Sequence, residues 1–151
     1  MRNASIHNVN PGRRLAGPLC LLGVVGALMG PPLAAVASDA AIKVPSGQKV
    51  VFLDMIIENA DTTGAIARFR FVSPQIARNG GNVRFMEAEP DMAFLCDTYA
   101  LPRLAETGQP VTQIVISLSD RAVAFGEADP DATQFFEGYR PGNGACDWDG
   151  F

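Results

Sequence analysis

The stretch QIVISLSDRAVAFG, residues 113–126, decides the predicted fold because apolar and small polar side chains alternate along it. Its apolar side chains recur at every second position, which places on one face of an extended chain Ile114, Ile116 and Leu118. Val115, Ser117 and Ser119 then fall on the other face. Residues 119–121 have the composition of a bend, after which Val123 and Phe125 resume the apolar face. We therefore expect a central β-hairpin over residues 113–126.

The first 37 residues have the composition of an export leader. The only charges before Asp39 are three arginines, and residues 15–37 are uncharged and mostly apolar. The small residues Ala35 and Ala37 match the pattern that a signal peptidase cleaves. We predict a signal peptide over residues 1–37 and a periplasmic or secreted protein. A retained membrane anchor is the alternative, because the apolar run is about long enough to span a bilayer.

The remaining residues, 38–151, have the length of one small domain. They carry nine basic and 16 acidic side chains, a net charge of −7, which argues against nucleic acid or an anionic membrane surface as partner. The only histidine, His7, lies in the leader, so histidine bases and histidine metal ligands are excluded from the domain. With no glycine-rich phosphate loop either, we expect no cofactor and no metal site.

Two cysteines, Cys96 and Cys146, follow the leader. In an oxidising compartment, two such cysteines most simply form one disulfide. The bridge would close a loop of about 50 residues, which stabilises the fold by roughly 4 kcal/mol in the chain-entropy treatment. A reactive free thiol is the alternative.

A second hairpin is predicted from residues 48–58 and 65–73, which alternate around a turn centred near residues 61–62. This register places Asp54 opposite Arg70 and Ile56 opposite Arg68. A candidate polar face on the sheet then consists of Asp54, Glu58, Arg68, Arg70, Asp120 and Arg121. The plainer interpretation of these charges is a solvated sheet face whose cross-strand pairs help to fix the register.

Two helices are predicted. Residues 89–91 open the first, which follows a short strand at residues 83–86 and ends or kinks near Ala100 because of Pro102. Asp129 and Pro130 begin the second, whose apolar stripe is Ala132, Phe135, Phe136 and Tyr139. The predicted class is α+β: an antiparallel sheet of about four to five strands, in the order β-β-(β)-α-β-β-α-β, with two helices mainly on one face.

Several short stretches carry a resemblance to a known family. They include RFRFV at residues 68–72, DM at 91–92, LC at 95–96, IVISL at 114–118, TQFF at 133–136, and Cys146 with Trp148. Together they make the chain resemble an uncharacterised family of small exported bacterial proteins, a domain of unknown function. The resemblance covers nearly all of the predicted domain and implies no established activity, cofactor or catalytic residue.

Three functions remain open. The first is a non-enzymatic binding, accessory or assembly module whose partner is another envelope or secreted protein. The second is a small hydrolase that uses Asp54, Glu58 or Asp120, since paired carboxylates in a cleft perform such chemistry. The third is a divalent-cation domain that uses oxygen ligands from residues 129–131 and 147–150, although their spacing does not complete an EF-hand loop.

Overall fold

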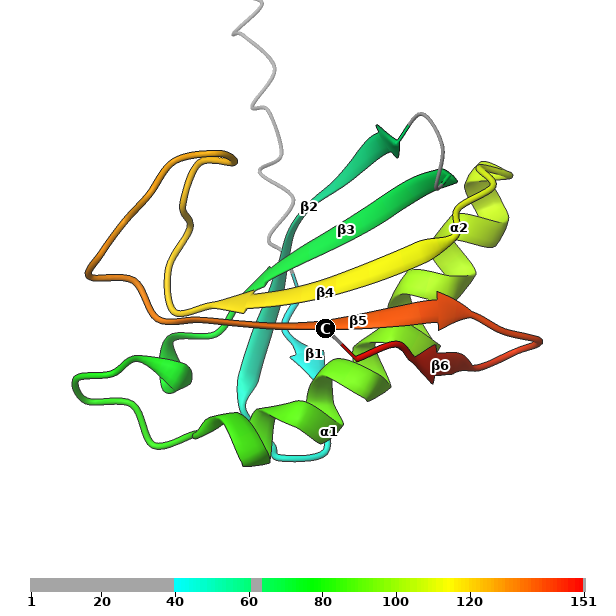
Figure 1. Ribbon diagram of the computed structural model, residues 1–151. Helices are drawn as coiled ribbons and strands as arrows, with labels where there is room; N and C mark the ends of the chain where they lie inside the picture. Colours follow the sequence, from blue (N-terminus) through cyan, green and yellow to red (C-terminus); the bar gives the residue numbers. More distant parts are fainter. Residues whose placement is uncertain (1–39, 61–63, 151) are drawn as a thin grey trace, which may run out of the picture. The chain divides into compact units, whose positions relative to one another are not determined.

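The computed structural model describes residues 40–60 and 64–150 (Figure 1). These residues form one curled, mixed sheet of six strands with a helix of 23 residues. The predicted signal peptide, residues 1–37, lies outside the described residues. Within the described residues, no helix is both long and apolar enough to cross a bilayer.

The strands lie side by side in the order in which they occur along the chain. They are β1 (Ile42–Lys43), β2 (Lys49–Ala60), β3 (Gly64–Val72), β4 (Gln113–Ser119), β5 (Gln134–Pro141) and β6 (Cys146–Trp148). The β3–β4 pair is parallel and every other neighbouring pair is antiparallel, so the prediction of a purely antiparallel sheet is wrong. A parallel neighbour requires a long crossover, and the helix between β3 and β4 supplies it.

The β2–β3 hairpin has the register that the sequence predicts. Asp54 pairs with Arg70 and Ile56 with Arg68. The register shifts between Phe52 and Asp54, which makes a β-bulge at Leu53. Because of this bulge, Leu53 and Asp54 both belong to the sheet face that carries the two arginines.

One interrupted helix replaces the first predicted helix and the predicted short strand at residues 83–86. It consists of α1 (Phe85–Leu95), a π-helical turn η2 (Cys96–Ala100) and α2 (Leu101–Thr107). The helix begins at Phe85 because Glu87 Oε2 accepts the backbone N–H of Arg84 at 2.8 Å. It ends at Gly108, whose φ of 64° suits a residue without a Cβ atom.

Pro102 was expected to end or kink the helix near Ala100. The chain instead widens into the π turn over Cys96–Ala100, and the Leu101 N–H bonds to the carbonyl of Cys96. The location of the disturbance was therefore predicted correctly, but its consequence is a wider turn and the helix continues. A single-turn 3₁₀ helix, η1 (Pro74–Ile76), follows β3.

The second predicted helix, over residues 129–139, is wrong, and so is the predicted return strand at Val123 and Phe125. The partner of β4 is β5, in which Leu118 pairs with Phe135 and Ser117 with Phe136. Phe135 and Phe136 consequently lie on opposite faces of the sheet, and Phe136 is 52% exposed. Residues 120–133 form the long connection that leaves β4 and returns to β5.

The helix packs on one face of the sheet, named here the helix face; the opposite side is the open face. On the helix face, the central side chains of β3 and β4 are fully or almost fully buried, as are those that meet them from the helix. They are Ala67, Phe69, Phe71, Ile114, Ile116, Leu118, Ala88, Met92, Leu95 and Cys96. The apolar face predicted for residues 114–118 is therefore confirmed. Of the predicted architecture, a sheet with helical structure on one face is correct, whereas the two separate helices are not.

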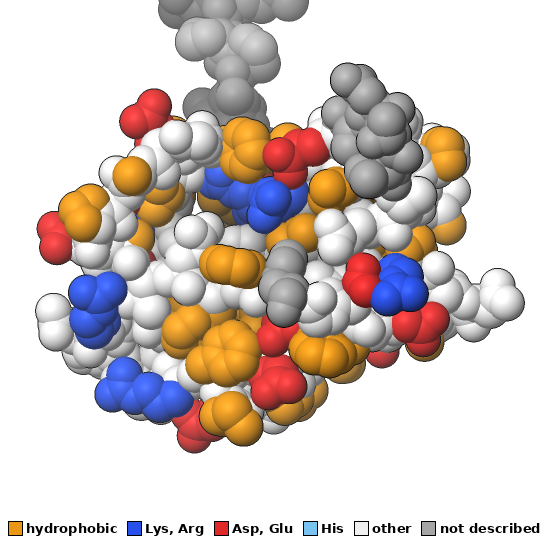
Figure 2. All heavy atoms as spheres, viewed as in Figure 1, with side chains coloured by type: hydrophobic (Ala, Val, Ile, Leu, Met, Phe, Trp, Pro, Cys, Tyr) orange, Lys and Arg blue, Asp and Glu red, His pale blue; other side chains and the backbone are white. Residues whose placement is uncertain are grey.

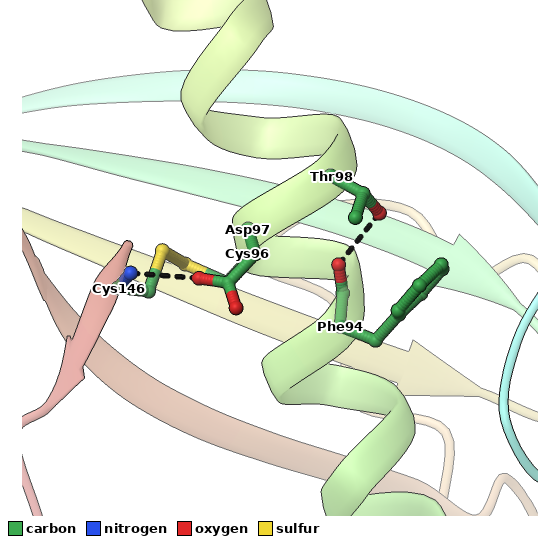
Figure 3. The surroundings of a disulfide bond; sticks show 5 residues. All are labelled: Phe94, Cys96, Asp97, Thr98 and Cys146. Carbon is green, nitrogen blue, oxygen red and sulfur yellow. Dashed lines mark hydrogen bonds between the residues drawn. A yellow bond between two sulfur atoms is a disulfide. The ribbon is translucent and has the colours of Figure 1, made fainter. Parts of the chain in front are cut away.

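A disulfide joins Cys96 on the π turn to Cys146 at the start of β6, with their Cα atoms 6.1 Å apart (Figure 3). The neighbouring Asp97 adds a second link, because its Oδ1 accepts the backbone N–H of Cys146 at 2.7 Å. The bridge pins the short edge strand β6 to the helix, which holds the C-terminal segment against the core.

Candidate functional site

The open face presents a regular arrangement of polar side chains across three strands. Arg68 and Arg70 project from β3, Ser117 and Ser119 from β4, and Gln134 from β5. The register places Arg70 beside Ser117, and Ser119 opposite Gln134. The strands cross in front of the helix in Figure 1, and the same view in Figure 2 shows basic side chains beside a recess of this face.

Both arginines face carboxylates on β2. Arg70 Nε lies 3.1 Å from Asp54 Oδ1, and Arg68 Nη2 lies 3.1 Å from Glu58 Oε2. The side chain of Arg70 is only 10% exposed, whereas that of Arg68 is 29% exposed. The structure thus brings together four of the six residues of the predicted polar face, and the burial of Arg70 exceeds what a solvated sheet face requires.

The connection between β4 and β5 covers part of this face. The carbonyl of Val123 accepts a hydrogen bond from Arg70 Nη2. The ring of Phe125 lies 5.9 Å and 5.8 Å from the guanidinium carbons of Arg68 and Arg70. Phe125 therefore caps both cations, although half of its surface remains exposed.

Asp120 and Arg121, the other two predicted residues, lie at the base of this connection. Arg121 donates to both carboxylate oxygens of Asp120 at 3.1 Å and 3.2 Å, and these bonds raise the pKa of the Arg121 guanidinium. The backbone N–H of Asp120 donates to the carbonyl of Thr133 at 2.9 Å, which closes the connection at its root. This pair is therefore placed to hold the loop.

Two adjoining hollows lie on the open face, and only the first is lined by residues of the loop. The loop hollow, about 190 Å³, is lined by Arg68, Arg70, Ser117, Ser119, Gln134 and loop residues 123–127. The strand hollow, about 340 Å³, shares Arg68, Ser117 and Gln134 with it and adds Gln113 and the apolar Ile66, Val115 and Phe136. The shared lining makes them one groove that begins under the loop and follows β4.

The loop hollow contains a buried hydroxyl without a hydrogen-bond partner. Ser119 is 6% exposed, and its Oγ forms no hydrogen bond with any of the described residues. Its neighbour Ser117 differs, because Ser117 Oγ accepts from Gln134 Nε2 at 3.0 Å. Asp54 Oδ1 is also enclosed without a hydrogen bond, since its contact with Arg70 Nε is ionic and lacks hydrogen-bond geometry. Buried polar atoms nearly always find a protein or water partner, so Ser119 Oγ gives the loop hollow unused hydrogen-bonding capacity.

Across the sheet, a different polar group is buried near β6. Glu137 is 7% exposed and accepts from Trp148 Nε1 at 2.5 Å. Next to it, burial raises the pKa of the Tyr139 phenol, and the charge of Glu137 raises it further. A hollow of about 320 Å³ lies beside them, lined by Glu89, Ala93, Tyr139, Cys146 and Trp148.

The residues of the hydrolase and cation hypotheses make other contacts. Asp54, Glu58 and Asp120 each contact an arginine. Asp129 Oδ1 accepts the N–H of Asp131 at 3.0 Å, and Asp149 bonds to Arg140, which lowers the pKa of the Asp149 carboxyl. Among the described residues, no cluster of three acidic or cysteine side chains is arranged to hold a metal ion.

The sequence interpretation missed the residues that complete the hollow: Ser117, Ser119, Phe125 and Gln134. Small hydroxyl residues at alternate positions of an otherwise apolar strand were visible at residues 115–119. That pattern indicates a face that is neither packed core nor open solvent. Phe125 could not be placed, because its role depends on the path of the loop over β3.

The fold and the groove together define a small, disulfide-bonded module in which one sheet face is packed by a helix and the other carries a polar recess. The chain belongs to the family of unknown function DUF6497, whose model matches residues 27–151. This match confirms the resemblance to a domain of unknown function. Comparisons with curated proteins and with solved structures found no match.

Proposed function

We propose that this protein is a non-enzymatic binding module of the periplasm or extracellular space, and that its ligand occupies the groove on the open face. The observation that carries the proposal is the unpartnered, buried Ser119 Oγ beside the buried Arg70. A ligand in the loop hollow would complete the hydrogen bonding of Ser119, as binding sites with a few convergent polar groups in a concave surface do.

A binding role is supported by the separation between the parts that stabilise the fold and the loop that covers the recess. The helix face and the disulfide provide a rigid base, and the loop of residues 120–133 contributes the residues that cover the recess. A loop positioned by a rigid scaffold is a common location for recognition residues. The leader predicted at residues 1–37 supports export, which also suits the disulfide.

The test is a binding screen on the exported protein, with mapping by backbone amide chemical shifts. Pools of small organic acids, alcohols, sugars and short peptides would be added to isotope-labelled protein. We expect shifts at residues 115–119 and 123–127. Ser119→Leu should abolish them by filling the loop hollow, whereas Glu106→Gln on the exposed end of α2 should leave them unchanged. Ligands that shift only residues outside the groove would contradict the proposal.

A further inference from the structure

The side chains on the open face form successive rows of different chemistry. Carboxylates lie on β2, guanidinium groups on β3 and hydroxyls on β4. Because Asp54 and Glu58 contact the arginines from the β2 side, they fix the orientation of both guanidinium planes. Fixed in this way, the arginines border the hydroxyl row without having to be ordered by a ligand.

The contacts of each guanidinium group with the protein do not use all of its N–H donors. Arg70 uses Nε toward Asp54 and Nη2 toward Val123, and Arg68 uses Nε and Nη2 toward Glu58. These contacts use Nε and Nη2 of each arginine and do not use Nη1. An arginine carries five N–H donors and no acceptor, so what remains can only donate.

The hydroxyl row supplies further donors. Ser119 Oγ has no partner within residues 40–60 and 64–150. Ser117 Oγ accepts from Gln134, which leaves the hydroxyl hydrogen of Ser117 to donate. Donors from β3 and β4 thus converge on the loop hollow. Their complement is a group with several acceptor lone pairs and no hydrogen, and an ionised carboxylate fits it best because hydrogen bonds to a charged acceptor are the stronger ones.

The strand hollow determines what is attached to that group. Its polar lining residues are Arg68, Gln113, Ser117 and Gln134, and between them it has an apolar surface made by Ile66, Val115 and Phe136. We propose that the groove binds a small organic acid whose carboxylate lies in the loop hollow against Arg70, Arg68 and Ser119, and whose apolar body lies in the strand hollow. This inference rests on the proposed function and specifies its ligand class.

One charge in the groove opposes such a ligand. Glu127 lines the loop hollow from the exposed side of the loop. Its repulsion of an incoming anion makes Glu127→Gln an informative variant, because that substitution should strengthen carboxylate binding by about threefold. The same substitution should leave a neutral ligand unaffected.

The experiment compares matched probes on the exported protein by calorimetry and amide shift mapping. Octanoate and phenylacetate should bind in the groove, and octanol and phenylethanol at least about tenfold more weakly, because a charged hydrogen-bond acceptor is lost. Sulfate should bind more weakly than octanoate because it lacks the apolar body. Arg68→Gln and Ser119→Ala should each weaken carboxylate binding by about tenfold, and Arg84→Gln, an exposed site at the start of α1, should not.

The inference fails if acids and alcohols bind equally, if Arg68→Gln and Ser119→Ala leave acid binding unchanged, or if only water fills the loop hollow. An alcohol, sugar or peptide that maps to the groove while the acids do not would overturn the ligand class and leave the proposed function standing. If no probe or partner maps to the groove, both are wrong.

Discussion

The two faces of one sheet are filled in different ways, although the same strands supply both. On the helix face, β3 and β4 contribute Phe69, Phe71, Ile116 and Leu118, all with 1% exposure or less. On the open face, the intervening positions contribute arginines and serines beside hollows of about 190 and 340 Å³. A close-packed interior stabilises the fold, whereas unfilled polar space provides no comparable packing energy. The contrast therefore separates the residues that hold the fold from those available to a ligand.

Replacing one aromatic ring on each face measures this difference most directly. Phe69→Ala should lower the free energy of unfolding by about 3–5 kcal/mol, because the ring is fully buried and its loss leaves a cavity. Phe125→Ala should cost about 1 kcal/mol or less, since the ring is 51% exposed and its main contacts are with two arginines. Urea unfolding followed by circular dichroism measures both. Equal losses would mean that the loop is part of the core.

The disulfide belongs to the helix side, so its removal should be the next largest effect. Replacing both Cys96 and Cys146 by serine should lower the free energy of unfolding by about 2–5 kcal/mol, because a loop of 50 residues is released in the unfolded chain. Denaturant unfolding with and without reductant measures it. Reductant should bring the wild type to the level of the variant and leave the variant unchanged; two free thiols in the native exported protein would refute the bridge.

Two buried polar residues sharpen the comparison further. Asp91 is fully buried and accepts from the Ser46 N–H at 2.8 Å, the Ser46 hydroxyl at 2.5 Å and Gln48 Nε2 at 2.5 Å. Asp91→Ala should cost about 2–3 kcal/mol, because the buried amide of Gln48 loses its acceptor. Ser119→Ala should change stability by less than about 0.5 kcal/mol, since its hydroxyl makes no bond to lose. A large loss at Ser119 in calorimetric melting would show that the hydroxyl is paired within the fold.

How far the sequence predicts this structure differs between the two halves of the sheet. The register of the β2–β3 hairpin was predicted correctly for Asp54 and Ile56, because alternation and turn composition agree there and opposite charges match across the strands; the bulge at Leu53 was not predicted. The apolar stripe of β4 and the Cys96–Cys146 bridge were also predicted. The two strand predictions rest on local alternation, and the bridge rests on there being only two cysteines after residue 37.

The prediction for the β5 region was wrong because its apolar residues fit both the helical period and the two-residue period of a strand. Ala132, Phe135, Phe136 and Tyr139 fit a helical stripe, but Phe135, Glu137 and Tyr139 also alternate toward the helix face. Glu137 hides the strand pattern, because a carboxylate is not expected on a buried face. Its hydrogen bond from Trp148 explains its burial, but that contact cannot be read from the sequence. Residues 134–141 form a strand because they pair with the second edge of β4. That pairing is a tertiary contact, which the local sequence does not show.

The candidate site was predicted in part for a related reason. Arg68, Arg70, Asp54 and Glu58 follow from hairpin register, which is local. The loop hollow depends on where residues 120–133 pass, and the predicted return strand at Val123 and Phe125 would have left no room for it. The composition of the loop does not determine its path, because the contacts that fix it come from Arg70 and Arg78, 53 and 55 residues away in sequence from their partners.

The two faces should also differ in their response to alkali, an effect that is confined to high pH. Burial raises the pKa of the Tyr139 phenol, and the charges of Glu137, Glu89 and Asp97 raise it further. The folded state therefore holds this proton more tightly than the unfolded state, so the contribution to stability is complete below pH about 10 and is lost as the pH rises above it. The loss should approach about 1.4 kcal/mol for each pH unit while only the unfolded chain is ionised.

Unfolding free energies between about pH 9 and 12 should fall less steeply for Tyr139→Phe than for the wild type. Tyr99, the only other tyrosine, then serves as the internal reference in ultraviolet titration of the variant. Identical slopes for the two proteins would show that the Tyr139 hydroxyl ionises freely, and that water reaches the packed side of the sheet as it reaches the open one.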